Sequence, residues 1–140
     1  MLCYTVDGVP FLYNGCEHCD TSQHSIFGNP GQFRIDRSND RSERSAFLRK
    51  LSSLHRTEPA FRDGAIRWLK NSAPDHLCTY LREAPDGEKI FCAVNFGNEP
   101  VTADCPEFSG GEVLLARGAE ILPGGLEIKS NGYMLLKKQP

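Results

Sequence analysis

The stretch IFCAVNF at residues 90–96 is the most apolar segment of the 140-residue chain and predicts the central strand of a β-sheet. Residues 77–82 alternate between two faces. Pro-Asp-Gly at 85–87 predicts the turn that joins these segments, because Pro fixes φ and Gly permits a positive φ. A further strand is expected at 66–70. The middle of the chain is therefore predicted to be an antiparallel sheet.

Short apolar segments continue to the end of the chain, each bounded by turn residues. Strands are expected at 101–105, 113–116, 120–122, 126–128 and 133–136. Pro-Gly-Gly at 123–125 predicts one turn, and Asn-Gly at 131–132 predicts a hairpin. Seven or eight short strands with turn residues about every eight to twelve positions indicate a mainly β fold, an antiparallel β-sandwich.

The first 60 residues follow a different pattern. VPFLY at 9–13 is a short apolar run closed by Asn-Gly, which predicts a strand buried on both faces, as in parallel sheets. Residues 16–40 are polar and have no clear period, so they are expected to form a long loop of the kind that is usually functional or disordered. Residues 1–60 offer the strand no partner strands, and we expect them to be part of a larger unit.

A helix is predicted over residues 41–57. Asp40 and Glu43 have the spacing of a capping box at its start. One apolar stripe follows at positions i, i+4 and i+7, made of Phe47, Leu51 and Leu54. Pro and Gly at positions 59 and 64 end the helix.

The charge balance excludes several classes of function. The formal net charge is −2 and the pI is about 6.1, which gives no electrostatic basis for binding nucleic acid or an anionic membrane. No apolar run approaches the ~20 residues that span a bilayer. Residues 1–7 lack the basic segment of a signal peptide, so the compartment stays open, with the cytoplasm as the default expectation.

Six cysteines raise the question of disulfides and metal binding; they are Cys3, Cys16, Cys19, Cys78, Cys92 and Cys105. At about 4% of the chain they are too sparse for a disulfide scaffold, so thiols are expected. Cys16-x-x-Cys19, with His18 and His24 nearby, leaves a metal site or a redox disulfide as alternatives. No second ligand cluster follows, and we expect neither a metal nor a cofactor.

The segment GVPFLYNGCE at residues 8–17 resembles the segment that follows the last conserved catalytic region of the α-amylase family, glycoside hydrolase family 13. The family pattern there is Gly-x-Pro-x-(Ile/Leu)-Tyr-x-Gly-x-Glu. The chain matches it at Gly8, Pro10, Leu12, Tyr13, Gly15 and Glu17. The order downstream also matches, with LRKLSSLHR at 48–56, PAFRDG at 59–64 and VNF at 94–96. The resemblance covers nearly the whole chain.

The resemblance implies that residues 1–60 are the last βα unit of an incomplete TIM-type barrel and that residues 61–140 form the C-terminal β-sandwich domain. The family cleaves or transfers α-glucosidic bonds with retention, which needs two carboxyls about 5–5.5 Å apart. Its catalytic carboxylates precede the matched segment, and its Asn-His-Asp motif does not occur in this chain. The chain is therefore expected to be inactive alone, a structural part of a glycosidase acting on α-glucans or maltooligosaccharides.

Glu17 and Arg34 are predicted to bind substrate only in a complete barrel, and no residue is predicted to be catalytic. The resemblance places Glu17 just past the last barrel strand, on the face where barrel active sites lie. Arg34 belongs to a loop that often shapes sugar subsites in the family. The alternative for both residues is a solvated loop. Trp68, the only tryptophan, either stacks on a sugar ring or packs in the core or between domains.

Three functions follow from these patterns. The first is a C-terminal fragment of an α-amylase-type glycosidase, and the second is a stand-alone carbohydrate-binding module. The third is a small protein that self-associates through the unpaired strand and helix, with an apolar surface on Phe11, Leu12, Phe47 and Leu51. Hydrolysis by the chain alone contradicts the first, absence of a sugar-induced change in Trp68 fluorescence contradicts the second, and a strictly monomeric state contradicts the third.

Overall fold

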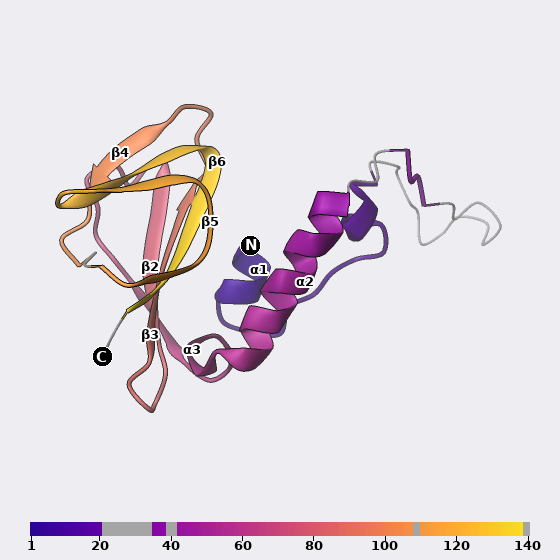
Figure 1. Ribbon diagram of the computed structural model, residues 1–140, viewed down its shortest axis with the longest axis horizontal. Helices are drawn as coiled ribbons and strands as arrows, with labels where there is room; N and C mark the ends of the chain where they lie inside the picture. The colour runs from indigo at the N-terminus through magenta and orange to yellow at the C-terminus, as the bar shows by residue number, and fades with distance from the viewer. Residues whose placement is uncertain (21–34, 39–41, 108–109, 139–140) are drawn as a thin grey trace.

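The computed structural model describes residues 1–20, 35–38, 42–107 and 110–138. These residues form one antiparallel sheet of six strands with helices beside it (Figure 1). The strands are β1 (Ala65–Trp68), β2 (Leu77–Glu83), β3 (Lys89–Asn95), β4 (Val101–Asp104), β5 (Glu112–Leu122) and β6 (Gly125–Lys138). Their order is β1-β2-β3-β6-β4, and β5 pairs with β6. The mainly β, antiparallel fold predicted from the strand pattern is confirmed.

Strands β5 and β6 form one long, bent hairpin that folds the sheet into two layers (Figure 1). Residues 133–138 of β6 pair with β3, whereas residues 125–128 pair with β4, so β6 passes from one layer to the other. The sequence predicts four shorter strands here with a hairpin at 131–132, and this prediction is wrong. The turn lies at Pro123 and Gly124, while Asn131 adopts a left-handed backbone conformation (φ 53°) inside β6, where the register shifts.

The corner in β6 is held by a buried amide at the end of β3. The side chain of Asn95 donates hydrogen bonds to the carbonyls of Glu99 (2.8 Å), Ile128 (2.9 Å) and Lys129 (3.2 Å). Its carbonyl oxygen accepts a bond from the Gly97 amide at 2.7 Å. Because the carbonyls of Ile128 and Lys129 lie where β6 leaves regular pairing, the amide satisfies groups that the sheet leaves open.

Strands β2 and β3 are buried on both faces, and consecutive residues serve different cores. Leu81 and Phe91 belong to the core between the two layers, together with Leu126 and Leu136 of β6. The opposite face of β2 and β3 packs against the helices through Tyr80, Ile90, Cys92 and residues of the helices themselves. The sandwich thus carries a third layer of helices on one side (Figure 1).

That helical layer consists of α1 (Leu2–Thr5), the short 3₁₀ helix η1 (Cys16–His18), α2 (Ser42–Thr57) and α3 (Pro59–Arg62). The helix predicted over 41–57 corresponds to α2. Its predicted stripe faces the sheet, since Leu51 and Leu54 are buried and the ring of Phe47 packs on that of Tyr133, with ring centroids 5.4 Å apart. The expected exposure of Leu51 is therefore wrong. The proposed cap residue Asp40 lies outside the described residues.

The strand predicted at residues 9–13 is absent, and this is a second correction. These residues adopt no regular structure, and the side chains of Val9 and Phe11 are 92% and 77% exposed. A strand buried on both faces needs partner strands, and among residues 1–20, 35–38, 42–107 and 110–138 none pairs with this segment. The division at residue 60 into two domains stays a prediction.

A buried arginine fastens the N-terminal segment and α3 to the sheet. The guanidinium of Arg82 in β2 forms an ion pair with Asp7 and donates to the carbonyls of Ala60 (3.0 Å) and Gly64 (2.5 Å). A cation at the C-terminal end of a helix is also favoured by the helix dipole. Lys137 forms a second set of ion pairs, the lysine clamp. Its Nζ lies 2.7 Å from a carboxylate oxygen of Glu58 and 2.5 Å from one of Glu88. None of the described helices is long and apolar enough to cross a membrane.

Candidate functional site

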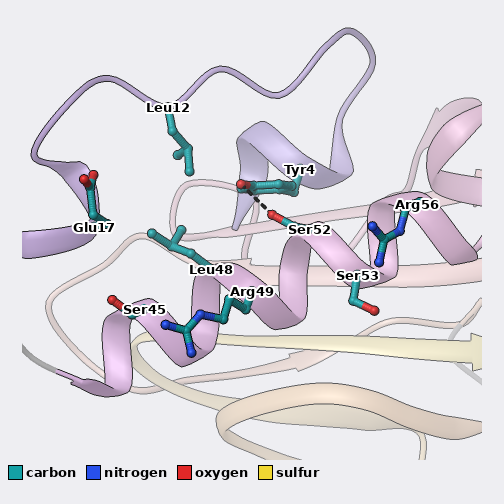
Figure 2. Close-up of a pocket in the computed structure, with 9 residues that line it drawn as sticks. All are labelled: Tyr4, Leu12, Glu17, Ser45, Leu48, Arg49, Ser52, Ser53 and Arg56. Carbon is teal, nitrogen blue, oxygen red and sulfur yellow. Dashed lines mark hydrogen bonds between the residues drawn. The ribbon is translucent and has the colours of Figure 1, made fainter.

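A groove of about 570 Å³ lies between helix α2 and the segment that precedes it (Figure 2). Helix α2 lines one side with Ser45, Leu48, Arg49, Ser52, Ser53 and Arg56. The other side comes from Tyr4 of α1, Leu12 and Glu17. Its size is in the range of small-molecule sites. Because it contains the one described residue predicted to bind substrate, the groove is the candidate site.

The segment that carries Glu17 is held in place by a compact turn. Gly15 has a positive φ of 93°, and a Cβ there would lie 2.8 Å from the side chain of Asp20, so the turn requires glycine. Arg44 of α2 donates from Nε to the carbonyl of Cys16 at 2.8 Å and ties the turn to the helix. The position of Glu17 is therefore fixed by local backbone geometry and by one bond to α2.

Glu17 itself is partly exposed, with 43% of its side chain accessible, and its carboxylate lies 3.5 Å from His18 Nε2. A carboxylate in such a position accepts hydrogen bonds from hydroxyl groups of a ligand. Arg34 lies outside the described residues, so its predicted substrate-binding role stays a prediction. The predicted binding role of Glu17 likewise stays a prediction.

The groove face of α2 was not found from the sequence, although a signal for it exists. Ser45, Leu48, Ser52 and Arg56 recur at spacings of three and four residues, which defines a second helix face beside the apolar stripe. The hydroxyl of Ser52 donates to the phenol oxygen of Tyr4 at 3.0 Å, shown by the dashed line in Figure 2. Hydroxyls and guanidinium groups therefore line the groove opposite Glu17.

The chemistry that these groups support is recognition. Among the described residues that line the groove, Glu17 is the only carboxylate. Retaining hydrolysis of a glycosidic bond needs two carboxyls about 5–5.5 Å apart, one as nucleophile and one as acid and base. The described groove offers hydrogen-bonding groups and the apolar side chains of Leu12 and Leu48, but it holds no such pair.

The cysteines and histidines near the groove do not form a metal centre in the described part of the chain. No group of three or more His, Cys, Asp or Glu side chains is placed to hold an ion there. His24, which belongs to the alternative metal site, lies outside the described residues. No disulfide joins any of the six cysteines, all of which lie in the described segments.

Trp68 lies on the edge strand β1 and is 61% exposed, so packing in the core of the described chain is ruled out. Its indole meets the ring of Tyr80 edge-on, with ring centroids 5.2 Å apart. Tyr80 is buried, and its hydroxyl lies 2.6 Å from Thr5 Oγ1. Burial raises the pKa of this hydroxyl. The indole therefore rests on a fixed, uncharged partner and presents surface to solvent.

Comparison with solved structures identifies the architecture. The fold matches that of a noncanonic maltogenic α-amylase, AmyB from Thermotoga neapolitana, with a TM-score of 0.63 and 20% identity over 98% of this chain and 34% of that one. Eubacterium rectale Amy13B gives a TM-score of 0.62 and 14% identity over 89% of this chain and 27% of that one. The chain has the fold of part of an α-amylase.

A family GH13_31 enzyme is also similar, with a TM-score of 0.51 and 20% identity over 69% of this chain and 16% of that one. The chain thus spans between 16% and 34% of the length of these amylase-type structures. No family model and no curated protein sequence matches the chain. The fold predicted from the resemblance to the α-amylase family is confirmed by the similarity of the structures.

Proposed function

We propose that the chain is the C-terminal part of an α-amylase-type glycosidase acting on α-glucans. In this proposal residues 1–60 are the last βα unit of a barrel, and residues 61–140 are a structural β-sandwich domain without catalytic residues. One observation carries it: nearly the whole chain follows the fold of a third of an α-amylase. The match of GVPFLYNGCE at residues 8–17 to the family pattern supports the same assignment.

The exposed segment at residues 9–13 supports the proposal independently. Val9, Phe11, Leu12 and Tyr13 form a run of exposed apolar side chains, and such runs mark surfaces that other parts of a protein cover. A barrel strand with partners on both edges buries side chains of this kind. The segment that the sequence predicts to be a buried strand therefore has the composition of one and lacks only its neighbours.

Complementation tests the proposal. Thermotoga neapolitana AmyB shortened by the third that matches this chain is expected to be inactive on maltooligosaccharides and to regain activity when this chain is added. Phe11→Ser is expected to prevent the recovery, because it removes an apolar contact that the barrel needs. Ile121→Ser is the matched control, since Ile121 is also partly exposed but lies on β5 in the sandwich. Hydrolysis of starch by the purified chain alone would overturn the proposal.

A second candidate, a carbohydrate-binding module, is favoured by the exposed indole of Trp68. Aromatic faces suit the apolar face of a pyranose, and contact with buried Tyr80 fixes the ring before a ligand arrives. Because the chain has one tryptophan, its fluorescence reports on this residue alone. Saturable changes with maltoheptaose, absent with cellohexaose, are the expected result. An unchanged spectrum at millimolar sugar rules this function out.

In the third candidate function the chain self-associates through the exposed apolar side chains of Phe11 and Leu12. This choice is supported by the burial of Leu51 against the sheet and by the packing of Phe47 on Tyr133. Sedimentation velocity of the wild-type chain and Phe11→Ser tests this third function. A concentration-dependent dimer in the wild type alone supports it, and a monomer at all concentrations contradicts it.

A further inference from the structure

The turn that precedes helix α2 in the sequence holds two cysteines on a short, hydrogen-bonded backbone. The Cys16 amide donates to the carbonyl of Tyr13 at 3.1 Å, and the amides of His18 and Asp20 both donate to the carbonyl of Gly15 at 3.0 Å. The Cys19 amide points back to the carbonyl of Cys16, with 3.5 Å between N and O. These bonds close residues 13–20 into a single compact unit.

The backbone geometry of η1 brings the two cysteines close together. In a 3₁₀ helix a rise of about 2 Å per residue separates the Cα atoms of residues i and i+3 by about 6 Å. A disulfide spans Cα atoms that are about 4.4–6.8 Å apart. Cys16 begins η1, and Cys19 caps it in a left-handed backbone conformation (φ 56°), so the Cα atoms of this pair have the required spacing. Both residues are partly accessible, which leaves the thiols open to small reagents.

The same geometry favours a disulfide over a metal. A structural zinc site needs four ligands. In residues 1–20, 35–38, 42–107 and 110–138 no group of three candidate ligands comes together. Two thiols at this spacing need no further group to form a disulfide.

We propose that Cys16 and Cys19 form a reversible intramolecular disulfide, a redox modification site at the wall of the groove. The oxidant is a low-molecular-weight disulfide such as oxidised glutathione. One cysteine thiolate attacks it, forms a mixed disulfide and releases one glutathione thiolate, which takes up the proton. The second cysteine then attacks the mixed disulfide, closes the Cys16–Cys19 bond and releases the second glutathione. Two protein thiols are oxidised, and one disulfide is reduced to two thiols.

The bond would act on the candidate site through Glu17, which lies between the two cysteines in η1 and lines the groove. Closing the ring fixes the backbone on both sides of this carboxylate. Arg44 contributes to the reaction by position, because its bond to the Cys16 carbonyl holds the turn on α2 at 2.8 Å. Loosening that bond increases the number of conformations in which the thiols are apart.

The test is equilibration of the full chain in glutathione buffers of graded redox ratio, followed by alkylation and peptide mass spectrometry. The expected product is a peptide with Cys16 and Cys19 joined, lighter by two hydrogens and not alkylated. Cys16→Ser and Cys19→Ser are each expected to abolish it. Cys3→Ser, which removes an exposed cysteine outside the turn, is the control and leaves it unchanged.

A second pair of variants tests the role of Arg44. Arg44→Gln is expected to require an oxidised-to-reduced ratio about threefold higher at the midpoint, the size expected for loss of one exposed hydrogen bond. Arg49→Gln, a residue of the same helix that also lines the groove, keeps the wild-type midpoint. The proposal is overturned if both cysteines stay alkylatable, if they carry only glutathione, if either pairs with Cys3, or if added zinc alone protects them.

Discussion

Replacing Arg82 by Met tests whether one buried cation joins the helical layer to the sheet. Its guanidinium is almost fully buried in β2 and donates to the carbonyls of Ala60 and Gly64. Its ion-pair partner, Asp7, is 62% exposed. Methionine has a similar length and no polar atoms that can donate, so the substitution removes the bonds and keeps most of the packing.

The size of the effect follows from these contacts. A hydrogen bond that involves a charged group contributes about 1.5–3 kcal/mol, so two buried carbonyls account for about 3–6 kcal/mol. Release from the desolvation penalty of a buried charge offsets part of this loss. Asp7 regains water when the arginine is removed and adds little. We therefore expect Arg82→Met to lower the free energy of unfolding by about 3 kcal/mol.

Two further variants separate the contributions. Arg82→Lys keeps the charge but loses the forked donor geometry, and we expect a loss of about 1.5 kcal/mol. Asp7→Asn removes only the exposed partner and is expected to cost less than 1 kcal/mol, as exposed ion pairs do.

Urea unfolding followed by Trp68 fluorescence and by circular dichroism measures all three variants, with stability taken from the midpoints at a common slope. An Arg82→Met protein within 0.5 kcal/mol of the wild type, or an Asp7→Asn protein that loses more than Arg82→Met, would refute the reasoning.

Three more predictions concern the corner of β6 and the lysine clamp. Gly132→Ala is expected to lower the melting temperature by more than 5 °C, because a Cβ there lies within 2.8 Å of three neighbouring atoms; a melt unchanged from the wild type contradicts this. Asn95→Ala is expected to lower the free energy of unfolding in urea by about 2 kcal/mol, since carbonyls of the corner lose their donor. The carboxylates of Glu58 and Glu88 raise the pKa of Lys137. The stability that this clamp contributes is therefore fully present below the unfolded lysine pKa of about 10.4 and is lost as the pH rises above it. Between pH 9 and pH 12 the melting temperature is expected to fall less steeply with pH for Lys137→Met than for the wild type. Parallel curves of melting temperature against pH contradict the prediction.

The strands were largely predictable because two-sided burial and turn residues are local signals. The apolar run at 90–96 became β3, and Pro-Asp-Gly at 85–87 lies between β2 and β3 as predicted. The Asn-Gly pair at 131–132 gave a wrong prediction, because the positive φ that a hairpin turn requires also occurs in a bulge inside a strand. What separates the two is the partner strand, and pairing of β6 with both β3 and β4 is not visible in local sequence.

Arg82 shows the limit of a period-two pattern. A charged residue in an alternating strand normally marks the solvent side, yet here the solvent side is covered by α3 and residues 5–7. This cover depends on tertiary contacts of Arg82 with two segments that are about 20 and 75 residues away from it in the sequence. The groove was predictable only in part for the same reason. Glu17 was identified from a motif, whereas tertiary packing alone brings the hydroxyls and guanidinium groups of α2 to face it.

Helix α2 makes different contacts on two faces, and this separates the functional hypotheses. One face buries Leu51 and Leu54 against the sheet. The other lines the groove with Leu48 beside the exposed segment at residues 9–13. Exposed apolar runs such as residues 9–13 mark surfaces that another part of a protein covers. The three hypotheses differ in what forms this cover. If it is the barrel, Phe11→Ser prevents complementation. If it is a second copy, the same variant is monomeric. If the chain acts through Trp68, the variant binds sugar as the wild type does. One substitution thus distinguishes all three.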